Sequence, residues 1–258
     1  MFKSGISITQ IAKTLNVDRG SLSIRLKGQG VNVVQDCGRK YYINDDYFEI
    51  IDSERKAYWS GFIFADGNVS KNGRMLEIGL SIESEHHLGI FLRDTNSTYL
   101  ISYRDVKIKD RIYPSCRVQI SSRKICLDLI KYGCIANKSL TKCFPQNLPD
   151  EMLTFFIRGY FDGNGNIYLA NNKKNVGLRI FSGSQQFCLG LQGKLIELFG
   201  IETKLYKDRS CYKIVCQKQI DVKKFLCFIY DKANVYLNAK YDKYQKCKAF
   251  IALLSGNI

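Results

Sequence analysis

Histidine is nearly absent from this chain, which has only two among 258 residues, adjacent at His86 and His87. The ten cysteines are scattered and form no CxxC pair, so we expect reduced, mostly buried thiols and no disulfide framework. Zinc fingers need clustered cysteine and histidine ligands, and many nucleases need a histidine base. The sequence therefore argues against zinc fingers and against nucleases that rely on a histidine base.

Long apolar runs and acidic residues are also scarce. No run approaches the roughly 18 apolar residues of a membrane span, and residues 1–5 lack the apolar core of a signal peptide. The 24 Asp and Glu residues are outnumbered by 39 Lys and Arg residues, which gives a net charge of +15 and favours a polyanionic partner. By charge alone, nucleic acid, an acidic membrane surface and a merely soluble basic protein are the alternatives. We expect an intracellular, cytoplasmic protein that binds double-stranded DNA and no membrane.

The centre of the chain repeats itself. The segment Trp59–Gly67 (WSGFIFADG) matches Ile157–Gly165 (IRGYFDGNG) at an offset of 157 − 59 = 98 residues. A second match, KDR at Lys109–Arg111 and at Lys207–Arg209, has the same offset, 207 − 109 = 98. Ser84 and Ser184 form a looser pair, each placed to cap a helix. Two matches at one offset indicate an internal duplication.

Each copy has the pattern of helix, hairpin, helix, hairpin, helix. In the first copy, residues 53–66 are helical and residues 68–82 form a hairpin around the turn signal Lys71-Asn72-Gly73. A second helix begins at Ser84, and residues 99–121 alternate between apolar and polar side chains. In the second copy, residues 221–231 and 238–254 are expected to be helices.

This alternation predicts sheets with one apolar and one basic face. In the first copy the apolar set Val106, Ile108, Val118 and Ile120 alternates with the polar set Lys107, Lys109, Arg117 and Gln119. Two matching basic faces suit the major groove of a pseudo-palindromic duplex, although an ordinary solvated face has the same pattern. The expected DNA contacts in the two copies are Arg74, Arg104, Lys107, Lys109, Arg111, Arg117, Lys173, Arg179, Lys204, Lys207, Arg209 and Lys213.

The first fifty residues differ from the repeats. Residues 8–17 are expected to form a short amphipathic helix and turn, and Asp18 to cap a second helix over residues 19–27. Small apolar side chains at Ala12 and Val17 suit close helix packing, and the glycines at 28 and 30 end the second helix. The segment resembles a helix-turn-helix, with a plain helical hairpin as the alternative, and residues 33–52 are expected to be a linker or small wing. The expected DNA contacts here are Arg19, Ser21 and Arg25.

The repeated segment has features that suggest chemistry. Small residues lie four apart in each copy, at Gly61 and Ala65 and at Gly159 and Gly163, so each helix has one flat stripe. Two such helices can pack backbone to backbone. This packing brings their C-terminal ends together near a pseudo-two-fold axis.

The residue at each helix end determines what the site can bind. Asp66 faces the negative end of its helix dipole, which costs about 0.3–1 kcal/mol and would be offset by a cation. Carboxylates in such a place hold Mg²⁺ beside scissile phosphates for phosphodiester hydrolysis, whereas Asp66-Gly67 as a simple loop turn is the alternative. The second copy has the neutral Asn164 here. Asp162, two residues earlier, points to a different side of the helix and is a poor substitute.

At these residues the chain resembles the single-chain LAGLIDADG homing endonucleases, from about residue 53 to the C-terminus. The resemblance implies an α+β fold in which two pseudo-symmetric αββαββα halves form a DNA-binding saddle, with the motif helices at their interface. The acid of the family falls on Asp66 and on Asn164, and its metal sites add the backbone carbonyls of Ala65 and Gly163. The implied cofactor is Mg²⁺, with Mn²⁺ as a substitute and Ca²⁺ as a non-cleaving one.

The family also places a basic residue near the attacking water or leaving group in each half. The matching positions are Lys138 and Lys240, which lie 138 − 66 = 72 and 240 − 164 = 76 residues after the motif position. An ammonium there can stabilise developing phosphorane charge, although either lysine can be an ordinary surface charge. Asn164 departs from the family pattern because it supplies a neutral oxygen where the family has a negative ligand.

We therefore predict three units: a helix-turn-helix module and linker over residues 1–52, a first repeat over 53–150 and a second repeat over 151–258. Together they predict a monomeric, site-specific DNA endonuclease that hydrolyses a long pseudo-palindromic duplex, in a nicking or cleavage-deficient form because of Asn164. A catalytically inactive DNA-binding regulator and an intron RNA maturase are the alternatives. No splicing segments flank the core, so an intein is not expected.

Overall fold

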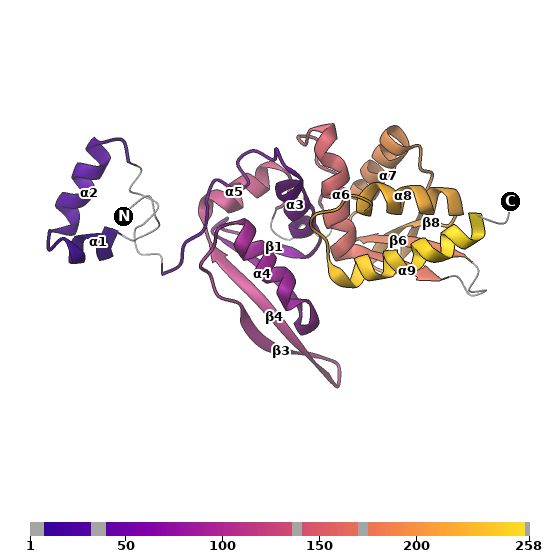
Figure 1. Cartoon of the computed structure of the whole chain (residues 1–258), viewed down its shortest axis with the longest axis horizontal. Coiled ribbons are helices and arrows are strands. Elements are labelled where there is room, and N and C mark those ends of the chain that lie inside the picture. Colours follow the sequence, from indigo (N-terminus) through magenta and orange to yellow (C-terminus); the bar gives the residue numbers. More distant parts are fainter. Residues whose placement is uncertain (1–7, 32–39, 136–140, 170–174, 256–258) are drawn as a thin grey trace.

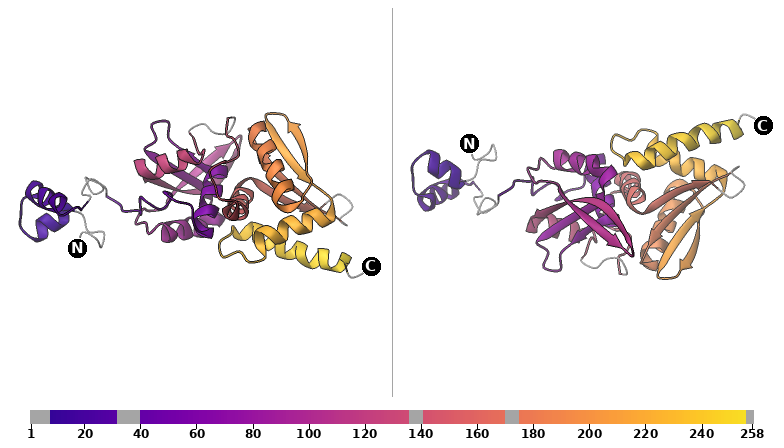
Figure 2. Two further views of the ribbon diagram at one scale, coloured as in Figure 1. Left: turned by 90° about the horizontal axis from the view of Figure 1, so that it is seen from above. Right: turned by 90° about the horizontal axis from the view of Figure 1, so that it is seen from below.

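The computed structural model describes residues 8–31, 40–135, 141–169 and 175–255. Two copies of one α+β arrangement lie next to each other, with α3 and α6 between them (Figures 1 and 2). The first half contains α3 (Glu54–Asp66), β1 (Gly67–Val69), β2 (Met75–Ser81), the 3-10 turn η3 (Ile82–Ser84), α4 (Glu85–Asp94), β3 (Ser102–Ile108), β4 (Arg111–Ser121) and α5 (Arg123–Lys131). The second half contains α6 (Asp150–Asn164), β5 (Gly165–Leu169), β6 (Val176–Ser182), α7 (Gln185–Phe199), β7 (Lys204–Asp208), β8 (Cys211–Cys216), α8 (Gln219–Tyr230) and α9 (Asn238–Ser255).

Each half has one four-stranded antiparallel sheet. The strand orders are β1-β2-β4-β3 and β5-β6-β8-β7, so the longer strand of each second hairpin pairs with the first hairpin. The predicted α+β duplication is therefore confirmed. The helix α9 follows the second copy as an addition to the repeated pattern.

Local sequence explains where the main elements begin and end. Gly67 and Gly165 follow the last residues of α3 and α6, where the chain changes from helix to extended backbone. Gly73 has a φ of +61° in the turn of the first hairpin, a conformation that glycine adopts without steric cost. Ser184 accepts a hydrogen bond from the backbone N–H of Phe187 at the start of α7, as an N-cap does.

One face of each sheet forms the apolar core of its half. In β4 the side chains of Val118 and Ile120 are buried, while Arg117 and Gln119 point to the opposite face and are partly exposed. The expected separation into an apolar and a polar face is confirmed in this strand.

In β3 the expected phase of the alternation was wrong. Val106 pairs with Tyr113 and Ile108 pairs with Arg111, and directly paired residues share one face of a sheet. Val106 and Ile108 therefore lie on the face of Arg117, while Lys107 lies on the other face. A shift of one residue in register exchanges the two faces of a strand, and the sequence of β3 does not show how it pairs with β4.

The two KDR segments are not at equivalent structural positions, although their shared offset of 98 suggested that they were. The first hairpin turns at Lys109 and Asp110, between the paired residues of β3 and β4, and the second turns at residues 209 and 210. Lys109 and Arg209 both have positive φ, at 54° and 52°, so they are structural equivalents at an offset of 209 − 109 = 100. Ser84 and Ser184, the N-cap residues of α4 and α7, have this same offset of 100.

The N-terminal segment contains α1 (Ile8–Thr14) and α2 (Arg19–Gly28). Asp18 accepts a hydrogen bond from the backbone N–H of Ser21 at 2.8 Å, so the predicted helix cap is confirmed. Ala12 is buried, but the side chain of Val17 is 46% exposed and therefore does not provide the expected close packing. Two helices and a turn are present, and their identity as a helix-turn-helix is not established by this geometry.

The segment expected to be a linker or wing is, in its described part, a component of the first half. The side chains of Ile43, Tyr47, Phe48 and Ile51 are buried in the main core. The hydroxyl of Ser122, at the start of α5, also donates a hydrogen bond to a carboxylate in this segment, that of Asp45. The first half therefore extends towards the N-terminus beyond the boundary expected at residue 53.

Candidate catalytic and nucleic-acid-binding site

The two motif helices, α3 and α6, cross in direct backbone contact. A Cβ atom at Gly61 would lie 2.0 Å from the carbonyl oxygen of Phe156, and one at Gly159 would lie equally close to that of Tyr58. Because no side chain fits at either position, the glycines let the helices approach closely. The expected packing of the two flat stripes is confirmed.

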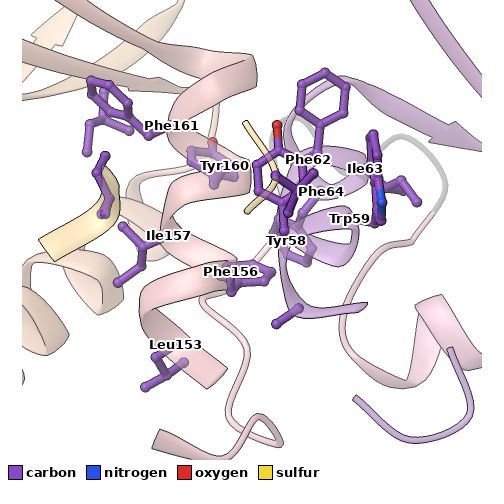
Figure 3. Packing of buried hydrophobic residues seen from close by; sticks show 14 of the residues in the cluster. Tyr58, Trp59, Phe62, Ile63, Phe64, Leu153, Phe156, Ile157, Tyr160 and Phe161 are labelled. Carbon is purple, nitrogen blue, oxygen red and sulfur yellow. The ribbon is translucent and has the colours of Figure 1, made fainter. Parts of the chain in front are cut away.

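Aromatic side chains surround this crossing (Figure 3). Trp59 and Ile63 of α3 point into the first half, whereas Leu153 and Ile157 of α6 point into the second (Figure 3). Phe64 reaches across the interface and packs edge-on against Phe156, with their ring centroids 5.5 Å apart. The motif helices thus belong to both cores, which fixes the two halves against each other.

The crossing brings together the C-terminal ends of the motif helices. A Cβ atom at Gly163 would lie 2.5 Å from the Cβ of Ala65 and 3.0 Å from Oδ2 of Asp66, so these backbones are adjacent. The Asp66 carboxylate is exposed at this junction, while Asn164 is partly buried and its Nδ2 donates a hydrogen bond to the Tyr160 hydroxyl at 3.4 Å. The geometry therefore places all four predicted motif-end residues at one junction.

Lys240 at the start of α9 reaches the same junction. Its Nζ donates a hydrogen bond to the carbonyl oxygen of Gly165, directly after α6. Burial lowers the pKa of Lys240, and the negative charges of Asp162 and Asp66 oppose this effect. The predicted lysine is thus a partly buried cation within electrostatic range of Asp66.

A second lysine, Lys142, lies at the interface and was missed by the sequence analysis. Its side chain is almost fully buried, and its Nζ lies 3.4 Å from the carbonyl oxygen of Phe64 and 4.6 Å from the ring centroid of Tyr160. Lys142 and Lys240 are separated by 240 − 142 = 98 residues, the offset of the motif itself. That offset was the signal that would have identified Lys142. The lysine chosen instead, Lys138, lies outside the described residues.

Asp162 is unavailable to a ligand at the motif ends, as the sequence analysis expected. Its carboxylate is buried and accepts hydrogen bonds from the hydroxyls of Tyr58 and Tyr230 and from the backbone N–H of Leu237. Desolvation by burial raises the pKa of Asp162 to about 6. The network also includes His87, whose Nε2 lies 2.9 Å from the Tyr58 hydroxyl oxygen. It joins α3 and α4 of the first half to α6 and α8 of the second.

A second polar contact ties the connection before α9 to the first half. The guanidinium of the buried Arg158 pairs with Glu54, and Glu54 also accepts hydrogen bonds from the backbone and side-chain N–H groups of Asn234. Together with the bond from Leu237 to Asp162, these contacts fix the segment that leads to Lys240. Neither network was visible in the sequence, because its members lie far apart in the chain.

The polar face of each sheet, called the outer face below, carries part of the predicted DNA-binding set. By strand register, the first outer face contains Glu77, Arg104, Val106, Ile108, Arg111, Tyr113, Arg117 and Gln119. The second outer face contains Tyr168, Arg179, Lys204, Tyr206, Asp208, Cys211 and Lys213.

Carboxylates and an aromatic ring orient the basic side chains on these faces. Glu77 pairs with Arg117 at 3.3 Å and with Arg104 at 3.6 Å. On the second outer face, Lys213 pairs with Asp208 at 2.7 Å, and the Arg179 guanidinium stacks 4.0 Å from the centroid of the Tyr168 ring. All these contacts are near the surface, where an ion pair contributes little stability and its arginine or lysine can exchange partners.

The other predicted contacts lie elsewhere. Lys107 and Lys207 are on the opposite faces of their hairpins, Lys109 and Arg209 are in the turns, and Arg74 lies in the turn between β1 and β2. Lys173 lies outside the described residues. In the N-terminal segment Arg19, Ser21 and Arg25 are exposed on α2, but the Ser21 hydroxyl donates a hydrogen bond to Asp18 and therefore supports the helix cap.

The described residues contain no cluster of three or more His, Cys, Asp or Glu side chains suited to a metal ion. A metal at the motif ends would therefore depend on Asp66, the amide of Asn164 and backbone carbonyls. No helix in the described part of the chain is both long and apolar enough to cross a membrane.

Comparison with known proteins bears on this arrangement. Residues 55–111 match the model of the WhiA LAGLIDADG-like domain, and residues 151–229 match that of a LAGLIDADG-like domain. The chain contains two LAGLIDADG-like domains. Each match begins within a motif helix, so the duplicated segment and the two matched domains coincide.

Solved structures with this fold include both nucleases and a WhiA protein. The homing endonuclease I-WcaI, bound to its DNA recognition sequence, has a TM-score of 0.55 at 14% identity, covering 72% of this chain and 86% of that one. I-GzeII in complex with its DNA target has a TM-score of 0.52 at 12% identity, covering 78% and 90%. Full-length DUF199/WhiA from Thermatoga maritima has a TM-score of 0.50 at 15% identity, covering 80% and 71%. These likenesses establish the fold and leave the activity open.

A curated relative is 28% identical over 213 residues and is described as a probable translation initiation factor IF-2 of Methanocaldococcus jannaschii. The match covers 79% of this chain but only 16% of that protein. The chain therefore spans about a sixth of that protein's length, and the likeness concerns one segment of it.

Proposed function

We propose that this chain is a site-specific DNA-binding protein of LAGLIDADG type that hydrolyses one strand of a long, pseudo-palindromic duplex. The observation that carries the proposal is the junction of the motif helices, where the Asp66 carboxylate lies against Gly163 and within electrostatic range of Lys240. An acid and a cation at the ends of paired helices, between two sheets with basic outer faces, suit a phosphodiester backbone. The likeness to DNA-bound homing endonucleases supports the same class of substrate.

The residues at the junction fit one divalent cation better than two. Mg²⁺ prefers oxygen anions, and Asp66 supplies an exposed carboxylate with the backbone carbonyls of Ala65 and Gly163 nearby. Asn164 supplies only a neutral amide, and its Nδ2 is bonded to Tyr160. When bound on the Asp66 side, Mg²⁺ would polarise the phosphate and activate water. Mn²⁺ would substitute, and Ca²⁺ would bind without supporting cleavage.

The side chains of the protein would do the remaining work. Lys240 is held by the Gly165 carbonyl at the junction, where an ammonium stabilises the negative charge that develops on a phosphorane. Lys142 matches Lys240 in its sequence distance from the motif but is nearly fully buried, so we assign it to interface packing. The basic side chains of the outer faces would bind the phosphates and bases on either side of the junction. In α2, Arg19 and Arg25 would contact flanking DNA as a helix-turn-helix does.

A DNA-binding regulator without catalytic activity is the second candidate. The specific observation that favours it is Asn164, which removes one of the two expected negative ligands from the motif ends. The likeness to WhiA shows that chains described as something other than endonucleases share this fold. Both candidates require double-stranded DNA binding and differ only in cleavage.

The substitution Asn164→Asp distinguishes the two candidates. With a supercoiled plasmid that carries a bound site selected from a random library, the unaltered chain with Mg²⁺ is expected to give nicked circles slowly. Asn164→Asp should produce linear DNA, because a second carboxylate completes the ligand set. The matched control Asn166→Asp adds the same charge two residues later, in β5, and should not produce linear DNA. Asp66→Asn in the unaltered chain leaves no carboxylate at the motif ends, so it should abolish cleavage and leave DNA binding intact.

Other outcomes are equally informative. Binding without cleavage in every variant would establish the regulator and overturn the nuclease proposal. Complete double-strand cleavage by the unaltered chain, unchanged by Asn164→Asp, would show that residue 164 is not a metal position.

A further inference from the structure

The two hairpins that carry the outer faces differ markedly in how far they extend beyond the body of the protein. Strands β3 and β4 span 7 and 11 residues, whereas β7 and β8 span 5 and 6. Figure 1 shows β3 and β4 projecting from the body of the first half. The equivalent hairpin of the second half is shorter, and its strand β8 is partly or fully buried throughout.

Both faces of the first hairpin are exposed near its tip. Ile108 on the outer face is 57% exposed, and Ile112 on the opposite face is 64% exposed. On the opposite face of the sheet, called the inner face below, α4 covers β3 as far as Tyr103, whose hydroxyl donates a hydrogen bond to Glu85 at the start of α4. The ribbon beyond Tyr103 comprises about five residues in each strand, or about 17 Å at 3.4 Å per residue. This length exceeds the roughly 8.5 Å depth of the major groove, which admits a two-stranded ribbon.

The chemistry at the two tips also differs. The last pair of the first outer face is Ile108 with Arg111, followed by Val106 with Tyr113. The equivalent last pair of the second outer face is Asp208 with Cys211. Both tips carry a carboxylate, because Asp110 lies in the first turn and Asp208, which is paired with Lys213, lies at the second. The difference is the exposed isoleucine beside an arginine at the first tip, which suits a base edge next to a phosphate. The second tip therefore lacks the features for deep entry into DNA.

We infer that the chain reads its target asymmetrically: the β3–β4 hairpin enters the major groove of one half-site, where Ile108 and Ile112 contact thymine methyl groups. This inference rests on the proposed DNA binding and identifies the side chains that give it specificity. Among the major-groove edges, the C5 methyl of thymine is the apolar partner for aliphatic side chains, and Arg111 can pair with a neighbouring phosphate or guanine. The second half then contributes mainly through Lys204, Arg179 and Lys213, which carry charge and little apolar surface.

The first experiment is selection of bound sites from a randomised duplex library with the full chain. We expect a block of strong preference that includes thymine in one half-site and weak preference in the other. Ile108→Ser should relax preference within that block only. The matched control Ile220→Ser removes an isoleucine of similar exposure, 66% against 57%, from α8, and should leave every position unchanged. Equal base preference in both half-sites, or a base preference within the block that Ile108→Ser does not change, would overturn the inference.

The second experiment changes only the DNA, so it does not depend on whether a variant folds. Replacing thymine with uracil in the preferred block removes the C5 methyl groups and leaves every hydrogen bond in place. Each contacted methyl should weaken binding about fourfold, the equivalent of burying one carbon group. The same replacement in the other half-site should have little effect. Tight, selective binding that is indifferent to uracil in the block would refute thymine reading and leave the proposed function intact. Failure of the full chain to enrich any site would instead refute the proposed function.

Discussion

Replacement of Gly61 by alanine tests the packing on which the whole arrangement depends. The new Cβ would lie 2.0 Å from the Phe156 carbonyl oxygen, and ordinary contact begins at about 3.4 Å, so α3 and α6 must separate locally by about 3.4 − 2.0 = 1.4 Å. The obstructing atoms belong to the backbone and cannot rotate away. Gly159→Ala meets the Tyr58 carbonyl in the same way and should have the same effect.

The expected loss of stability follows from two opposing effects. Overpacking typically lowers stability by about 1–3 kcal/mol, and we expect a clash with backbone atoms to cost an amount at or slightly above the upper end of that range. Alanine is a better helix former than glycine by about 1 kcal/mol, which offsets part of the cost. The unfolding free energy should therefore fall by about 2–3 kcal/mol. At about 2–4 °C per kcal/mol for a chain of this size, Tm should fall by about 5–10 °C.

The chain provides both a local probe and matched controls for this measurement. Its single tryptophan, Trp59, is buried in α3 two residues before Gly61, so urea unfolding followed by its fluorescence reports on the crossing. Gly89 in α4 and Gly193 in α7 are helical glycines with no atom within 4 Å of a Cβ. Alanine at either should stabilise the protein by up to about 1 kcal/mol. If Gly61→Ala behaves like Gly89→Ala, the close crossing of the motif helices is wrong.

Three further predictions concern charge. Burial raises the pKa of Asp162 to about 6 and lowers that of His87 to about 3, so from about pH 4 to 6 rising pH destabilises the fold through Asp162 and stabilises it through His87. Asp162→Asn removes the effect of Asp162, so the unfolding free energy should rise with pH more steeply, by up to about 1.4 kcal/mol per pH unit. Urea unfolding at pH 4, 5 and 6 measures this slope, and an unchanged slope would contradict the buried carboxylate. DNA affinity should fall steeply with salt concentration. If Arg117 neutralises one phosphate, Arg117→Ala should reduce the slope of log K against log salt by about 0.9. An identical slope would mean that Arg117 does not contact the DNA. Arg25→Ala should weaken binding to a long duplex in an anisotropy titration without affecting a short central duplex, and equal losses on both would mean that α2 does not contact flanking DNA.

The sequence alone determined the local elements and the duplicated plan. The motif segments show why α3 and α6 form, pack and stop: the small residues at 61 and 159 permit contact, and glycines at 67 and 165 follow their last residues. The cap at Asp18 and the turn around Gly73 are equally local, because each depends on residues within a few positions. The position of Asp66 beside the second motif followed from the same symmetry.

Only the tertiary structure decided which side chains meet across the chain. The face of Lys107 depends on the pairing of β3 with β4, and a one-residue change in register would reverse it. The partners of Asp162 come from α3, α8 and the segment before α9, and are separated from it by up to 104 residues. Alternation and capping act within a few residues along the chain, whereas these contacts are set by how whole helices and strands pack. The difference in reach between the two hairpin tips is likewise a result of packing, because it depends on where helical cover of the inner face ends.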